Sequence, residues 1–226
     1  MYKFWTVDVL SFVTIFFTIS VFISMLFYPG GNIHDPSQSG YSISHNFLSE
    51  LGGYKSHSGL SNLISFLIFN FSMILFTLIG ISFLFIPKLF KEDSISFIIS
   101  IIGSVFLLFG TIFFAGIGLT PHDLHLDAHI FFALNAFRLL VPGLILYFFV
   151  LMRSGVSKKY SLMIFCLLFF TFLYVIYQIV SDSPLTSIEQ MVEQAIIQKV
   201  ITLINIVCMF FLSFAFSERL KDIKLS

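Results

Sequence analysis

Residues Ser94–Leu119, SISFIISIIGSVFLLFGTIFFAGIGL, form a run without a single charged side chain. The run is longer than the roughly 20 residues that an α-helix needs to cross the hydrocarbon core of a bilayer. It ends at Thr120–His129, TPHDLHLDAH, which packs three of the six histidines and two of the twelve acidic residues into ten positions. A second apolar run, Ile130–Met152, follows at once. Two apolar runs around a short polar segment predict two membrane-spanning helices joined at one face of the membrane.

The whole chain contains six such runs. It is 58% hydrophobic and 11% charged, with a mean hydropathy of +0.99. A soluble domain of 226 residues could not bury that much apolar surface. We therefore predict an all-α protein, a polytopic membrane bundle of six transmembrane helices that forms one domain over residues 1–226. The expected spans are about Phe4–Tyr28, Leu60–Ile86, Ser94–Leu119, Asp127–Met152, Tyr160–Val180 and Ala195–Phe216.

Lysine and arginine are distributed unequally between the two ends of these spans. Because both residues favour the cytoplasmic side, the distribution predicts cytoplasmic N- and C-termini in a multi-pass protein of the cell membrane. The formal net charge is zero and no basic block is present, so no nucleic-acid partner is expected. In this orientation nine of the twelve basic residues are cytoplasmic: Lys3, Lys88, Lys91, Arg153, Lys158, Lys159, Arg219, Lys221 and Lys224.

The outer side, by contrast, collects histidines and carboxylates. Residues 29–58, called the outer loop below, are expected to be ordered, with a short helix that Ser44 caps and Gly52 ends. Glu50 lies in this predicted helix. In the predicted topology all six histidines lie on the outer side: His34, His45, His57, His122, His125 and His129.

The second outer segment, Thr120–His129, is typical of a helix start. Thr120 is expected to cap the helix, with Pro121 in its first turn. A helix that begins there places His122, His125 and His129 within a sector of about 60° on one face. We predict that the two outer segments meet, with Glu50 close to His129 or to the backbone amides around Asp123.

Three polar residues fall near the middle of the predicted spans, at Asn70, Arg138 and Asn205. Arg138 lies about 16 Å below the outer end of its helix, at 1.5 Å per residue. An arginine at this depth costs at least about 2.5 kcal/mol, so we expect it to face the bundle interior, with a bound ligand or with asparagine and carbonyl partners. The ligand-binding residues predicted from the sequence are therefore Glu50, Asp123, His129, Arg138, Asn70 and Asn205.

Two motifs resemble the domain-of-unknown-function family numbered 998, six-span membrane proteins of prokaryotes. NFLSELG at Asn46–Gly52 is similar to the family's Ile-Ser-Glu/Asp-Leu-Gly segment after the first helix, with Leu48 where the family more often has Ile. GLTPHD at Gly118–Asp123, followed by His129, is similar to its Gly-x-x-Pro-x-Asp…His segment before the fourth helix. The family is distantly similar to eukaryotic six-span proteins linked to GPI-lipid remodelling and autophagy. The resemblance implies six spans and no assigned activity, and it does not extend to His122 or His125.

Three functions are compatible with these patterns. The favoured one is binding of a lipid-like or other membrane-soluble ligand, with the outer loop as a lid. The alternative is a metal-dependent intramembrane hydrolase or lipid-modifying enzyme, in which His125, His129 and His45 hold a divalent metal such as zinc, with His57 in place of His45 as a variant. A transporter is least favoured, because no inverted repeat is visible. Membrane lipids or lipid-like small molecules are the expected partners, and the sequence is also compatible with a homo-oligomer.

Overall fold

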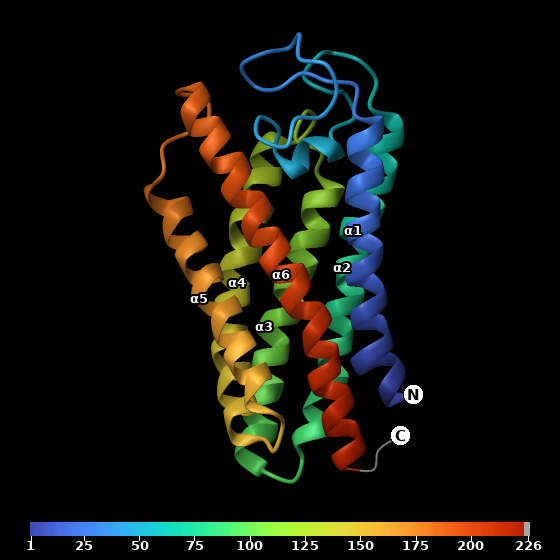
Figure 1. Ribbon diagram of the computed structural model, residues 1–226, viewed down its shortest axis with the longest axis vertical. Helices are drawn as coiled ribbons and strands as arrows, with labels where there is room; N and C mark the ends of the chain where they lie inside the picture. Colours follow the sequence, from blue (N-terminus) through green and yellow to red (C-terminus); the bar gives the residue numbers. More distant parts are fainter. Residues whose placement is uncertain (224–226) are drawn as a thin grey trace.

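The computed structural model describes residues 1–223 and shows six long helices packed side by side (Figure 1). All six are long and apolar enough to cross a membrane, and no strand occurs among the described residues. The predicted all-α fold with six spans is confirmed. The helices are α1 (Val9–Phe27), α2 (Leu63–Phe85), α3 (Ser94–Leu119), α4 (Leu126–Arg153), α5 (Lys158–Val180) and α6 (Ile188–Asp222); the short helical segments are η1 (Phe4–Asp8), η2 (Leu48–Gly52) and η3 (Ile86–Phe90).

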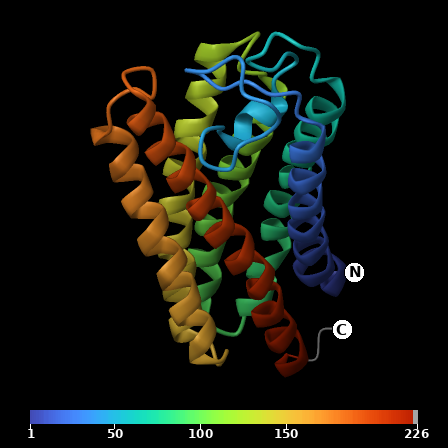
Figure 2. The same ribbon diagram turned by 45° about the horizontal axis from the view of Figure 1, so that its top comes forward.

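Helix α3 packs most extensively on α4 and α2, whereas α5 lies at the rim against α4 and α6 (Figure 2). Small residues set the α3–α4 distance. A Cβ atom on Gly143 would lie 2.7 Å from the side chain of Leu107, and one on Gly103 would lie 3.0 Å from the ring of Tyr147. Close backbone approach through small residues is the usual way for membrane helices to gain packing contacts, since lipid supplies no hydrophobic driving force between them.

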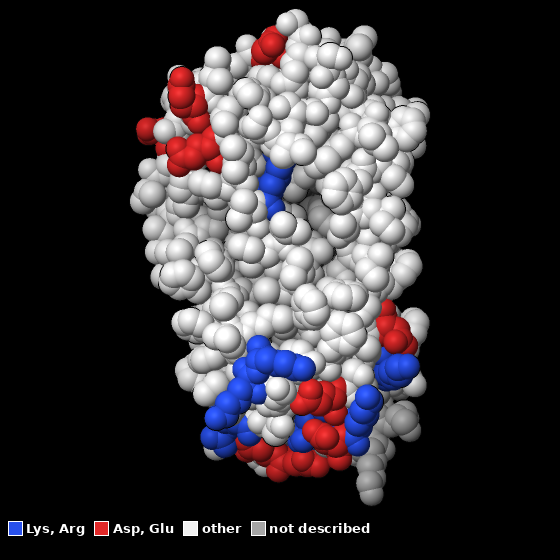
Figure 3. Space-filling view, in the orientation of Figure 1, with Lys and Arg blue, Asp and Glu red and all other residues white. Residues whose placement is uncertain are grey.

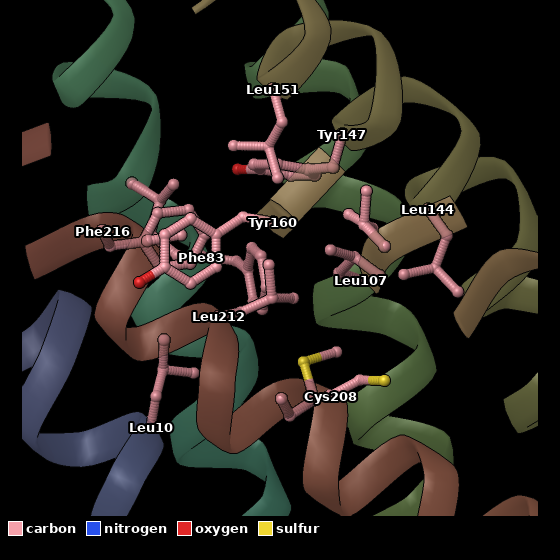
Figure 4. Packing of buried hydrophobic residues seen from close by; sticks show 14 of the residues in the cluster. Leu10, Phe83, Leu107, Leu144, Tyr147, Leu151, Tyr160, Cys208, Leu212 and Phe216 are labelled. Atoms are coloured by element: carbon pink, nitrogen blue, oxygen red, sulfur yellow. The ribbon is translucent and has the colours of Figure 1, made fainter. Parts of the chain in front are cut away.

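The main core lies in the half of the bundle that contains the chain termini (Figure 4). Phe83 stands edge-on to Tyr147, with ring centroids 5.1 Å apart. The Tyr147 hydroxyl is fully buried but lies 2.6 Å from the Ser104 hydroxyl, so its polar tip has a partner. Aromatic packing and one satisfied polar pair thus hold α2, α3 and α4 together.

The N-terminus and the last turns of α6 lie at the same end of the bundle (Figure 1), and most of the basic atoms visible in Figure 3 gather at that end. Two ion pairs link the segment before α3 to the ends of α4 and α6: Arg153 Nη2 lies 2.9 Å from Asp93 Oδ2, and Arg219 Nη2 lies 2.6 Å from Glu92 Oε2. The asymmetry is the one on which the prediction of cytoplasmic termini rests.

The expected helix start at Thr120 is wrong. Helix α4 begins at Leu126, with His125 in the N-cap position, and residues 121–124 form a turn instead. The Thr120 hydroxyl donates to the Gly116 carbonyl at 2.7 Å, so it closes α3 and leaves α4 uncapped. Of the three histidines expected on one helical face, only His129 lies in the helix.

The expectation that Arg138 faces the bundle interior is also wrong. Arg138 is exposed on the outer surface of α4, as are Phe131 and Ile145, seven residues before and after it. Seven residues are close to two helical turns, so the three share one face. The insertion cost of arginine does not determine which face of α4 packs inward, and that face consists of apolar residues such as Phe137 and Leu144. A long side chain on the surface can extend toward the headgroups instead.

Candidate functional site: an acidic and histidine-lined cavity under the outer loop

Asn46 organises the outer loop. Its side chain is completely buried, and its Nδ2 donates to the Gly31 carbonyl at 2.7 Å and to Glu50 Oε2. Its Oδ1 accepts from the Ser42 backbone N–H at 2.8 Å and from Gln38 Nε2 at 2.6 Å. These four bonds use the full capacity of the amide. Asn46 therefore ties both limbs of the loop to one oxygen of Glu50.

The short helix expected from Ser44 to Gly52 is present only in part. The structure has a 3-10 helix, η2, that begins at Leu48. Ser44 contacts the Nδ1 atom of His45 at 2.8 Å and caps nothing, because Asn46 holds the preceding residues in a turn. Gly52 does end the helix, as expected.

Side chains from α2 and α6 fasten η2 to the bundle. Asn70 donates to the Gly52 carbonyl at 2.9 Å, and Ser65 donates to the Leu51 carbonyl at 2.9 Å. From α6, Gln198 accepts from the Leu48 amide at 2.8 Å, and the Lys199 ammonium donates to the carbonyl of Asn46. Further bonds run from Asn62 to the carbonyls of Leu51 and Gly53. The loop is thereby held down on two sides of the bundle.

Asp123 joins the loop to the α3–α4 connection (residues 120–125). Its two carboxylate oxygens accept from the backbone N–H groups of Tyr54 and Lys55, both at 2.9 Å. These two hydrogen bonds are called the Asp123 clamp below. Beside the clamp a Cβ atom on Gly53 would collide with the ring of His122, so only glycine lets the two segments approach this closely. The two outer segments therefore meet, but through Asp123 and His122.

Glu50 is the buried acid of the site, with 3% of its surface exposed. Asn46 binds its Oε2, while its Oε1 lies 3.5 Å from His57 Nε2. The rings of His57 and His122 lie 5.4 Å apart, and those of His122 and His129 lie 6.0 Å apart. Glu50 Oε1, His57 Nε2 and His122 Nδ1 are buried without a hydrogen-bond partner among the described residues. Three polar atoms that lack partners thus lie along one row of side chains.

Burial, and to a smaller extent the nearby His57, lower the pKa of His122 to about 4, so this imidazole is neutral at pH 7. Burial, with the charge of Glu50 as the next cause, raises the pKa of both Tyr28 and Tyr41. The phenols around the site therefore stay protonated.

Glu50 and the three histidines line a cavity of about 570 Å³ beside the outer loop, called the polar cavity below. The loop side contributes Ser49, Glu50 and His57, and the α3–α4 connection and α4 contribute His122, Asp123 and His129; the apolar rim includes Ile33, Phe47, Leu126, Ile130, Pro184 and Leu185. A cavity with a few convergent polar groups and a perturbed pKa is the usual form of a ligand site.

A second, mostly apolar cavity of about 100 Å³ lies among the helices and is called the inner chamber below. Phe17, Phe69, Phe114 and Phe137 are among its walls, and Asn205, Gln178 and Thr202 are among its polar groups. Leu48 and Ser49 of η2 also line this chamber. Ser49 lines both cavities, so the polar cavity and the apolar chamber adjoin at this residue.

The predicted ligand residues separate into three groups. Glu50, Asp123 and His129 line the polar cavity, although Glu50 contacts His57, and His129 Nδ1 lies 2.7 Å from the Thr120 carbonyl. Asn205 lines the inner chamber. Asn70 lines neither cavity, and its amide donates to the Gly52 carbonyl. Arg138 belongs with Asn70 in the third group, because it also lines neither cavity.

The residues proposed as metal ligands do not come together. His45 contacts Ser42 and Ser44, His125 is exposed at the start of α4, and His129 lies inside the polar cavity. Within residues 1–223 no three His, Cys, Asp or Glu side chains lie close enough to hold a metal ion. The His-x-x-x-His spacing of His125 and His129 is not realised as a helical pair, because α4 begins only at Leu126.

Sequence reasoning offered His57 only as an alternative to His45 in a metal site, and it did not include His122 or Lys199 among the site residues. The proximity of His57 to His122 depends on how the outer loop folds back over the α3–α4 connection, which a local sequence pattern does not predict. Gly53 carried the only local signal, as a glycine that leaves room for a neighbouring ring. No protein-family model matches the sequence, and no curated protein and no solved structure is similar to it. The resemblance described above therefore depends on its two motifs alone.

Proposed function

We propose that the protein binds a single amphiphilic, lipid-like molecule, with its polar group in the polar cavity and part of its hydrocarbon in the inner chamber. The observation that carries the proposal is the position of Ser49, which lines both cavities. A polar site that adjoins an apolar one matches the two ends of an amphiphile. A purely polar or a purely apolar ligand would match only one of the two cavities.

The remaining hydrocarbon has a route out to the bilayer. The inner chamber of about 100 Å³ is smaller than an engineered cavity of about 150 Å³ that binds benzene, so it takes only a short stretch of chain. Tyr174 lines both this chamber and a groove of about 350 Å³ between α5 and α6, whose other walls are apolar residues such as Leu173 and Ile204. We infer that the rest of the chain lies in this groove.

Native mass spectrometry tests the proposal with the full chain in a neutral oligo-oxyethylene detergent. The probes are three amphiphiles with the same C12 chain: 1-O-dodecylglycerol, dodecylammonium and dodecyl phosphate. Ala133 lines the inner chamber, and Ala133→Phe adds an aromatic ring that fills it. Thr202→Leu fills the chamber from α6 instead. Val105→Phe, on the exposed face of α3, is the control of similar size change.

We expect wild type and Val105→Phe to retain one amphiphile per chain, and Ala133→Phe to bind every probe at least tenfold more weakly. Thermal unfolding identifies a variant that fails to fold, in which case Thr202→Leu replaces it. Binding that is equal in wild type and in a folded chamber-filling variant, or no retained amphiphile in wild type, would overturn the proposal.

A further inference from the structure

We infer that the polar cavity selects headgroups that donate hydrogen bonds, namely hydroxyl-bearing or ammonium-bearing amphiphiles, over anionic phosphate headgroups. This inference rests on the proposed function and adds the chemical class of the ligand. It follows from the atoms in the cavity wall that lack partners and from the charges around them.

The free atoms of the cavity are one carboxylate oxygen, Glu50 Oε1, and two imidazole nitrogens, His57 Nε2 and His122 Nδ1. Glu50 is more than nine-tenths buried, and its Oε1 has no hydrogen-bond partner among the described residues. A buried carboxylate requires donors or a cation, because its solvation by water has been lost. Asn46 satisfies only the other oxygen, and His57 Nε2 at 3.5 Å lies at the limit of hydrogen bonding. A ligand N–H or O–H group would supply the missing donor.

His122 adds a second buried polar atom that lacks a partner. Its Nδ1 is buried and without a partner. Its ring lies between those of His57 and His129, at centroid distances of 5.4 and 6.0 Å. Burial keeps this imidazole neutral at pH 7, since its pKa is lowered to about 4. A neutral imidazole nitrogen that carries no hydrogen accepts a hydrogen bond and offers no charge to an anion.

The cations near the site do not offset Glu50 for an anionic ligand. The Lys199 ammonium already donates to the carbonyls of Asn46 and Ala195. Lys55 is the one lysine of the cavity wall, and its side chain is exposed to water. Asp123, also in the wall, adds a second negative charge, with both oxygens bound to backbone amides. A phosphate group would therefore meet two carboxylates and one solvated ammonium.

The same three C12 probes test the inference at pH 7. In wild type we expect dodecylammonium and 1-O-dodecylglycerol to bind at least tenfold more tightly than dodecyl phosphate. Glu50→Gln keeps the shape of the side chain and an acceptor for Asn46 but removes the charge. This substitution should weaken the binding of dodecylammonium at least tenfold and the binding of 1-O-dodecylglycerol by less. Asp127→Asn, an exposed acid of α4 outside the cavity, is the matched control and should leave all three affinities unchanged.

The two proposals fail in different ways. If chamber-filling variants weaken all probes but dodecyl phosphate binds wild type as tightly as the others, ligand binding stands and the headgroup inference is wrong. If chamber-filling variants change no affinity, the proposed function fails and this inference fails with it. The order of affinities in wild type decides the headgroup question by itself, so a folding defect in Glu50→Gln does not leave it open.

Discussion

Asp123→Asn is predicted to loosen the outer loop locally without unfolding the bundle. In wild type the two Asp123 oxygens accept from the amides of Tyr54 and Lys55, each at 2.9 Å. Asparagine retains one acceptor and turns an NH₂ group toward the second amide. One hydrogen bond to a charged acceptor is thereby lost, and two donors face each other.

A hydrogen bond to a charged group contributes about 1.5–3 kcal/mol, and water access to this exposed clamp places the loss at the low end. We therefore expect the loop to lose about 1–2 kcal/mol of local stability, which corresponds to a change of about 5- to 30-fold in the population of opened states. Hydrogen exchange at the amides of Tyr54 and Lys55 measures this change directly, because exchange follows local opening.

The matched control for this experiment is Asp127→Asn, which removes an exposed acid near the start of α4 that lies outside the polar cavity. Its exchange at Tyr54 and Lys55 should equal that of wild type. Unchanged exchange in Asp123→Asn would show that the clamp contributes nothing to holding the loop. Faster exchange throughout α2 and α3 would show that the damage is global and would equally refute a local role.

Two further predictions concern pH and topology. Because the pKa of His122 is lowered to about 4 in the folded chain, the unfolded chain binds more protons below about pH 6.5, and stability should fall from there toward pH 4. Thermal unfolding of His122→Gln should show a shallower loss over this range, and an identical slope would contradict the assignment. A cysteine placed at Ser39 should react with an impermeant reagent added outside the cell, and one placed at Ser157 should not; the reverse pattern would invert the topology.

The fold was predictable because a lipid bilayer restricts the sequences that can cross it. Each span requires a long apolar run, so six such runs gave six helices, and the predicted Ser94–Leu119 is the observed α3. Helix ends in the polar segments were less predictable. Threonine is a common N-cap residue, but the Thr120 hydroxyl donates to the Gly116 carbonyl of the preceding helix. A local pattern cannot distinguish a cap of the following helix from a bond to the preceding one.

The candidate site was predictable in location and only partly in membership. Glu50, Asp123 and His129 lie in short motifs with unusual density of polar groups, and all three line the polar cavity. His57 and His122 come from segments whose approach depends on Gly53 and on the Asp123 clamp, which are long-range features. Arg138 illustrates the opposite error, because a cost of insertion does not determine which face of a helix packs inward.

The fastening of the outer loop has a consequence for how binding must be measured. Eight hydrogen bonds from α2 with its cap, from α6 and from Asp123 hold residues 46–55, and opening the loop as a flap would break them together, at roughly 1 kcal/mol each. A ligand of the proposed kind would then exchange with the bilayer through the side of the bundle, along the groove between α5 and α6. Its occupancy is set by its mole fraction in the lipid, so adding inert lipid lowers the bound fraction, whereas adding buffer leaves it unchanged.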